Sequence, residues 1–199
     1  MATTETRRVA AEAPAAASTA DPGPLGLAGF AATTMVLSFV NAGLVDKGAI
    51  AAVLPLALFY GGLAQLLAGL LEYRRGNTFG TTAFTTYGAF WLAFAFYAWF
   101  FQKATTPSSA TGLFLLMFGI ITAYLTIAAL RVSGAVLTVF ILLTLTFVVL
   151  AIGEFASSSG IGKVGGYLGI LTALAAFYTS AAIVVNSTWK RAVLPVFPF

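Results

Sequence analysis

Long apolar runs dominate the chain, and short polar separators divide them. Six segments are long and apolar enough to cross the hydrocarbon core of a bilayer, which takes about 20 residues. They cover residues 25–44, 49–71, 81–101, 111–130, 132–152 and 162–185. The separators hold charged residues and helix breakers, among them Asp46, Gly76 and Pro107. The pattern therefore predicts an all-α integral membrane protein with six transmembrane helices.

The composition supports a membrane protein and excludes several classes of site. Apolar residues make up 60% of the 199 positions and charged residues only 8%, whereas soluble domains carry roughly 25% charged residues. The chain contains no cysteine and no histidine, so disulfides, thiolate metal sites and the commonest general base are excluded. The sequence thus predicts no metal and no cofactor. Its basic residues are scattered, which disfavours nucleic acid as a partner.

The two ends of the chain differ from the apolar middle. Residues 1–20 are rich in Ala, Thr, Pro and Glu and contain no large apolar run, which predicts a disordered N-terminal tail. Residues 21–190 form the six-helix transmembrane domain, and residues 191–199 form a short C-terminal tail. The fourth and fifth spans are separated by almost nothing, which predicts a tight antiparallel hairpin.

Lysine and arginine counts predict the orientation. If the N-terminus is inside, seven of these residues fall in inside segments, whereas Lys47, Lys103 and Lys163 fall outside. Because cytoplasmic loops carry the excess of positive charge, we expect a multi-pass protein of the cell membrane with both termini in the cytoplasm.

The middle of every span is free of Asp, Glu, Lys and Arg, so a buried acid–base relay of the kind used in proton pumps is missing. Hydroxyls and amides are available instead. Phe30, Thr34, Ser38 and Asn41 share one face of the first helix, and Gln65 and Glu72 lie seven residues apart in the second. Further polar residues lie at the start of the third helix and along the sixth: Thr81, Thr82, Thr85, Thr86, Tyr87, Thr172, Tyr178, Thr179, Ser180 and Asn186. Such groups solvate a small polar solute or a carboxylate; the alternative is that they bond between helices or to their own backbone.

One long motif is more specific than the composition. The run Phe-Tyr-Gly-Gly-Leu-Ala-Gln at residues 59–65 continues through Leu-Leu-Glu-Tyr-Arg-Arg-Gly-Asn-Thr-Phe-Gly at 70–80 and Thr-Ala-Phe-Thr-Thr-Tyr-Gly at 82–88, followed by Phe90 and Trp91. Together with Pro-Leu-Gly-Leu at 24–27, Leu-Ala-Ile-Gly at 150–153 and Val-Leu-Pro at 193–195, it closely resembles the acetate uptake transporter family, and in particular its bacterial succinate–acetate permeases. The resemblance covers residues 21–195. Asp21 and Gly23 depart from the family pattern, which has Asn and Ala there.

The resemblance implies six helices around a central pore in each protomer and a homo-oligomer, a hexamer. It also implies an apolar constriction formed by Phe30, Tyr87 and Leu143, and links Ala176 to substrate size. A charged Asp21 would repel a carboxylate if it faced the pore opening and would cap the helix if it did not. The expected substrate path combines the resemblance with the polar inventory: Thr33, Thr34, Asn41, Gln65, Glu72, Thr85, Ala176 and Asn186.

The implied function is transport of acetate and related small carboxylates, including succinate, across the lipid bilayer. Two mechanisms stay open at this point, proton-coupled uptake and an anion channel. In proton-coupled uptake a proton would neutralise the passing carboxylate, whereas in an anion channel the carboxylate would pass in its charged form. A urea or short-amide channel is the alternative solute class. The lack of His, Cys and paired mid-membrane carboxylates disfavours an intramembrane enzyme, and a non-transporting sensor or assembly subunit is a further alternative.

Overall fold

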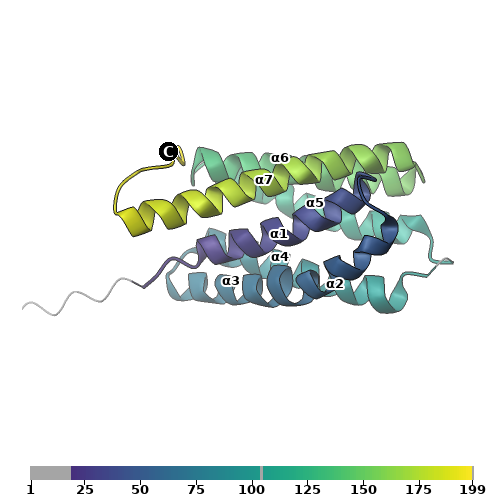
Figure 1. Ribbon diagram of the computed structural model, residues 1–199, viewed down its shortest axis with the longest axis horizontal. Helices are drawn as coiled ribbons and strands as arrows, with labels where there is room; N and C mark the ends of the chain where they lie inside the picture. The colour runs from purple at the N-terminus through teal and green to yellow at the C-terminus, as the bar shows by residue number, and fades with distance from the viewer. Residues whose placement is uncertain (1–18, 104, 199) are drawn as a thin grey trace, which may run out of the picture.

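The computed structural model describes residues 19–103 and 105–198, and the helices within these ranges pack side by side in one bundle (Figure 1). Within these residues, six helical rods are long and apolar enough to cross a membrane. The predicted disordered tail falls on residues 1–20, of which 1–18 lie outside the described residues. The start of α1 and the C-terminal segment lie at the same end of the bundle (Figure 1), as an even number of crossings requires. We refer to this end as the proximal end.

Four rods are single helices and two are composite. The elements are α1 Gly23–Asn41, η1 Lys47–Ala49, α2 Ile50–Leu58, η2 Phe59–Ala64, α3 Gln65–Arg74, α4 Thr78–Phe96, η3 Tyr97–Phe101, α5 Ser108–Ala129, α6 Gly134–Phe155 and α7 Ser159–Trp189. The second rod joins η1, α2, η2 and α3, and the third joins α4 and η3.

The rods match the six predicted spans to within a few residues, and polar caps explain several of the differences. Asn77 accepts a hydrogen bond from the Gly80 N–H at 3.0 Å, and Ser133 accepts one from Val136 at 3.2 Å. Ser158 does the same for Ile161 at 3.4 Å. These three polar side chains, which lie between the apolar runs of the sequence, therefore satisfy free N–H groups in the first turns of the helices. The predicted hairpin is present, since α5 and α6 pack along each other across a short link.

The second rod contains a local change of helical geometry. Pro55 lies inside α2 and lacks an N–H, and the π-helical stretch η2 follows it. Gly61 of η2 is buried where α1 and α4 approach, because a Cβ at this position would lie 2.5 Å from the Thr33 Oγ1 and 2.9 Å from the Trp91 Cδ1. A residue with a side chain would therefore push these helices apart.

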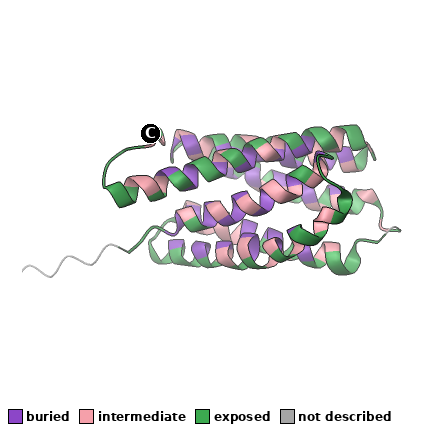
Figure 2. Cartoon of the chain, viewed as in Figure 1, coloured by how far each residue is buried: buried purple, intermediate pink, exposed green. Residues whose placement is uncertain are grey.

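Helix α7 packs along both α1 and α6, while α3 packs along α4. Buried residues face the middle of the bundle and exposed ones face outward (Figure 2). Many exposed residues are large and apolar, such as Phe59, Leu67 and Ile127. An apolar outer face is what a lipid environment requires, and it replaces the charged surface of a soluble protein.

The C-terminal segment folds back onto the start of α6. The Gly134 N–H donates to the Phe197 carbonyl at 2.8 Å, and the Ala135 N–H donates to the Val196 carbonyl at 3.2 Å. Asn186 holds the same segment, since its Oδ1 accepts from the N–H groups of Val193 and Leu194 at 2.7 and 2.9 Å. The segment thus satisfies helix-terminal N–H groups that otherwise have no intrahelical partner.

The contact between α1 and α7 depends on a glycine, which gives a prediction. A Cβ at Gly166 would lie 2.7 Å from the Ala42 Cα, whereas a Cβ at Gly162, one turn earlier, would have no neighbour within 4 Å. We expect Gly166→Ala to lower the free energy of unfolding by about 1–3 kcal/mol, because backbone must move to admit the methyl group. Thermal unfolding in detergent measures this. The matched variant Gly162→Ala is expected to leave stability unchanged or raised, and an equal loss in both variants would contradict close packing at Gly166.

Candidate functional site

A cavity of ≈ 180 Å³ lies between α1, α4, α5 and α6, and we call it the main cavity. Phe90, Phe94, Phe114 and Phe147 supply much of its apolar wall. Its polar lining comes from Thr34, Ser38, Asn41, Gln102, Thr111, Thr146 and Glu154. A cavity of this kind, apolar with a few polar groups, is the usual form of a site for a small molecule.

A second, much smaller cavity of ≈ 20 Å³ lies toward the proximal end, lined by Leu27, Gln65, Phe84 and Phe140 among others. Phe30 and Leu143 line both cavities, and Tyr87 lines the smaller one. All three side chains are buried. The structure therefore brings the three residues of the expected constriction together at the junction of the two cavities, which we call the neck.

Aromatic packing and one hydrogen bond fix the neck. The rings of Phe30 and Tyr87 have centroids 5.7 Å apart, and Tyr87 lies 6.1 Å from Phe140. The Tyr87 hydroxyl donates to the Thr122 Oγ1 at 3.0 Å, and Thr122 in turn donates to the Phe118 carbonyl at 2.7 Å. The phenol is thus anchored to α5, so its polar atom is used and its ring is presented to the neck.

Two buried hydrogen-bond donors in the main cavity lack partners among the described residues. The Trp91 Nε1 and the Thr34 Oγ1 are buried and unpaired, and both residues line the main cavity. The Gln65 Oε1, on the smaller cavity, is likewise unpaired. Because buried polar groups are nearly always hydrogen-bonded, these atoms are candidates to contact water or a solute.

Neighbouring glycine and aromatic residues hold Trp91 in place. Gly61 allows the indole to approach η2, as described above, and the ring packs edge-on against Phe90 and Phe94 at 5.0 and 5.9 Å. In the sequence Trp91 appears only within the family motif, and nothing in that motif indicates that its Nε1 is a donor in a cavity. Spacing along the chain could not reveal it, because the position of the Nε1 depends on contacts between separate helices.

Of the expected path residues, Thr34 and Asn41 line the main cavity and Gln65 lines the smaller one. Thr33 is buried with its hydroxyl donating to the Gly29 carbonyl at 2.9 Å. Thr85 donates to the Thr81 carbonyl at 2.6 Å. Ala176 and Asn186 also lie outside both linings: Ala176 is buried in the hydrophobic core with Phe30 and Leu143, and Asn186 holds the C-terminal segment.

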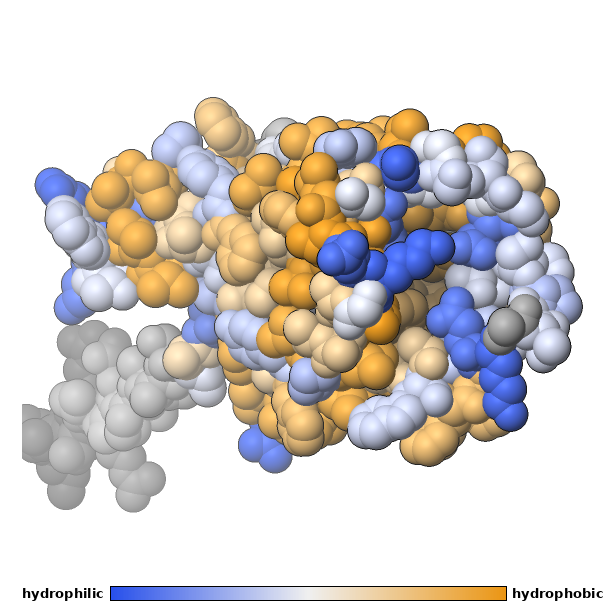
Figure 3. Space-filling model, turned by 45° about the vertical axis from the view of Figure 1, so that its right-hand side comes forward, coloured by the Kyte–Doolittle hydropathy of each residue, from blue (hydrophilic) through white to orange (hydrophobic). Residues whose placement is uncertain are grey.

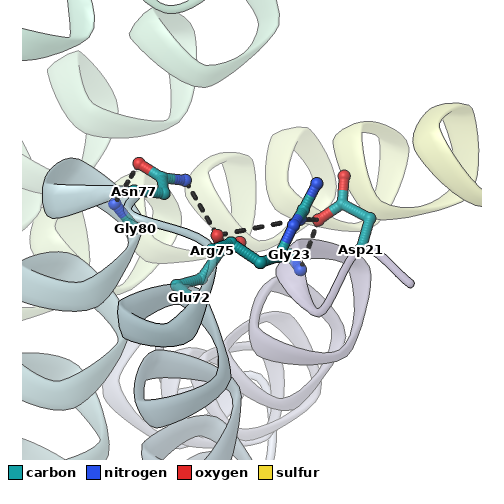
Figure 4. A network of polar contacts seen from close by, with 6 residues as sticks. All are labelled: Asp21, Gly23, Glu72, Arg75, Asn77 and Gly80. Atoms are coloured by element: carbon teal, nitrogen blue, oxygen red, sulfur yellow. Dashed lines mark hydrogen bonds and ion pairs between the residues drawn. The ribbon is translucent and has the colours of Figure 1, made fainter. Parts of the chain in front are cut away.

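Glu72 lies in a polar cluster at the proximal end (Figure 4). Its carboxylate is buried and accepts from the Asn77 amide at 2.9 Å. The Arg75 guanidinium lies 3.7 Å from Glu72 and 2.7 Å from Asp21. Asp21, which precedes the N-cap Pro22, also accepts from the Gly23 N–H at 2.9 Å and pairs with Arg75. The cluster joins the start of α1 to the turn between α3 and α4.

Sequence and structure comparisons identify relatives of the chain. A family model described as the GPR1/FUN34/yaaH family matches residues 4–199. The succinate-acetate/proton symporter SatP of Escherichia coli strain K12 is 38% identical over 180 residues, which cover 89% of this chain and 95% of SatP. Acetate permease A of Emericella nidulans is 38% identical over 198 residues, covering 90% of this chain and 66% of that protein. Ammonia transport outward protein 2 of Saccharomyces cerevisiae is 37% identical over 188 residues, covering 90% and 66%.

A solved structure shows the same fold. The structure of the bacterial acetate channel SatP superposes with a TM-score of 0.83 at 37% sequence identity, covering 90% of this chain and 99% of that chain. These particular relatives are thus named as transporters or as a channel.

Proposed function

The chain belongs to the GPR1/FUN34/yaaH family, and we propose that it passes acetate and related small carboxylates, succinate included, across a cell membrane. The relatives named as a succinate-acetate/proton symporter, an acetate permease and an acetate channel support this proposal. The observation that carries it here is the main cavity, where the Thr34 and Trp91 donors lie unpaired beside an apolar neck.

Neutral donors suit a transported carboxylate better than a fixed positive charge. An ion pair at the neck would hold the anion tightly, whereas conduction requires binding that is weak enough to release. A hydroxyl and an indole N–H offer hydrogen bonds of the order of 1 kcal/mol net each. The Phe30, Tyr87 and Leu143 side chains then impose the barrier, because they offer the solute little but apolar surface.

The placement in the membrane is part of the proposal. Within the described residues, Arg74, Arg75, Arg131, Lys190 and Arg191 lie at the proximal end, and Lys47, Lys103 and Lys163 at the opposite end. The positive-inside rule then places the proximal end and both termini in the cytoplasm. A homo-hexamer, each protomer with its own pore, is consistent with the apolar exposed faces, since these suit neighbouring protomers as well as lipid.

Acetate flux in proteoliposomes tests the proposed function and its mechanism. We expect the purified protein to accelerate acetate entry above that of empty vesicles and to leave urea swelling unchanged. An imposed pH gradient that drives acetate together with protons would establish symport, whereas voltage-driven flux without proton movement would establish an anion channel. Urea or ammonia permeation without acetate flux would overturn the proposal.

The unpaired donors give a prediction for the main cavity. We expect Thr34→Val and Trp91→Phe each to lower the acetate transport rate at subsaturating concentration about five- to tenfold, because each removes one hydrogen bond of about 1–1.5 kcal/mol. Radiolabelled acetate uptake measures this. Thr138→Val and Trp99→Phe are the matched controls, since Thr138 is exposed on α6 and Trp99 is exposed on η3. Equal rates in all four variants would remove the donors from the path.

The neck gives a prediction for selectivity. We expect Leu143→Ala to raise the ratio of succinate to acetate transport about tenfold, because three carbon atoms leave the narrowest part of the path and longer acids then meet less steric resistance. Leu145→Ala, at an exposed position on the same helix, is the control and is expected to keep the original ratio. Competition uptake with both labelled acids measures the ratio, and an unchanged ratio in Leu143→Ala would place the constriction elsewhere.

A further inference from the structure

A third cavity opens at the end opposite the proximal end, and we call it the lysine vestibule. It has a volume of ≈ 460 Å³ and lies between the end of α1, η1, the end of α6 and the start of α7. Its charged and polar lining consists of Lys47, Lys163, Asn41, Glu154 and Ser157 to Ser159. Figure 3 turns this end toward the reader and shows several hydrophilic residues on it beside apolar ones.

The lysine vestibule adjoins the main cavity. Asn41, Ile50, Leu150 and Glu154 line both spaces, so a solute that enters the vestibule passes these residues to reach the unpaired donors of Thr34 and Trp91. The vestibule therefore lies on the route into the proposed path, whereas the Arg75 cluster lies at the other end of the bundle.

The charge of the vestibule favours an anion. Its lining includes two lysines, Lys47 and Lys163, and a single carboxylate, that of Glu154. Neither lysine forms an ion pair with a carboxylate of the described residues. A charged group at the mouth of an apolar path raises the local concentration of the opposite charge and hence the rate of entry.

Lys163 is placed by packing. Gly43, at the turn after α1, has φ +71°, a conformation that favours glycine. A Cβ at Gly43 would lie 3.1 Å from the Lys163 Cε, so the lysine stem runs across this turn from α7. The turn and α7 together thus direct the ammonium toward the vestibule.

We propose that Lys47 and Lys163 form a recruitment site that binds the carboxylate group of the substrate before it enters the main cavity, with Glu154 opposing this attraction. The inference rests on the proposed transport function. It adds a charged site outside the neck that affects the rate of entry at low substrate concentration, while the neck keeps control of which acids pass.

The test measures exchange of trace labelled acetate across vesicles that contain the purified protein. Equal salt on both sides makes the result independent of protein orientation, and zwitterionic lipid removes anionic headgroups as competitors for the lysines. We expect Lys163→Gln, and more so the double variant with Lys47→Gln, to lower the exchange rate about three- to tenfold at low ionic strength. Glu154→Gln is expected to raise it. These differences shrink at about 150 mM salt, where the screening length falls to about 8 Å.

Two controls make the result decisive. Lys103→Gln removes one positive charge at the same end but outside the vestibule lining, and we expect it to keep the wild-type exchange rate. Lys163→Arg keeps the positive charge, and we expect it to keep most of the wild-type exchange rate. Two results would overturn the recruitment site. In the first, the wild type exchanges acetate, and both Lys163→Gln and the double variant exchange it at the wild-type rate at every salt concentration. In the second, Lys103→Gln shows the same loss of rate as Lys163→Gln. A wild type without acetate exchange would instead overturn the proposed function.

Discussion

The constraint on which the structure depends is that a polar group inside a bilayer must find its hydrogen-bond partner within the protein. Most threonines of the spans meet it by donating to the carbonyl four residues earlier, as Thr122, Thr146 and Thr179 do. Against that background four buried side-chain atoms of the described residues are unpaired, those of Thr34, Gln65, Thr81 and Trp91, and Thr34 and Trp91 both line the main cavity. The same constraint that holds the helices together therefore also marks the cavity, because a donor left free in such an environment is suited to a solute.

The sequence predicts the spans well because the physical cause is local. Bilayer thickness sets the length of an apolar run, and the observed rods follow these runs, with Asn77, Ser133 and Ser158 adjusting the ends as caps. The neck residues could be named only through the family resemblance. Phe30 and Tyr87 lie on α1 and α4 and Leu143 on α6, and no periodicity within one helix shows that three side chains on three helices meet.

For the remaining path residues, the sequence does not determine which side chains line a cavity. Thr33 and Thr34 are adjacent, yet Thr33 bonds to its own helix and lies 3.4 Å from the Leu56 carbonyl, whereas Thr34 faces the main cavity. The difference depends on how α1 is rotated about its own axis relative to η2. The positions of hydroxyl residues along the sequence do not specify that rotation. Asn186 is similar: its amide is costly to bury, and in the structure it lies in α7 and bonds to the backbone of the C-terminal segment that follows.

The distribution of charge fits passage of an acid through an uncharged neck. The smaller cavity beside the neck has no Asp, Glu, Lys or Arg in its lining; Glu154 lies toward one end and Glu72 toward the other. Burying an ionised carboxylate without partners costs several kcal/mol or more, and on one side of the neck the Thr34 and Trp91 donors would offset part of that cost. On the other side Gln65 supplies an amide, which can donate to a carboxylate or accept from a carboxylic acid. A solute that carries its own proton would therefore cross the neck at a lower desolvation cost, and proton-coupled transport of that kind would require no ionisable residue at the constriction.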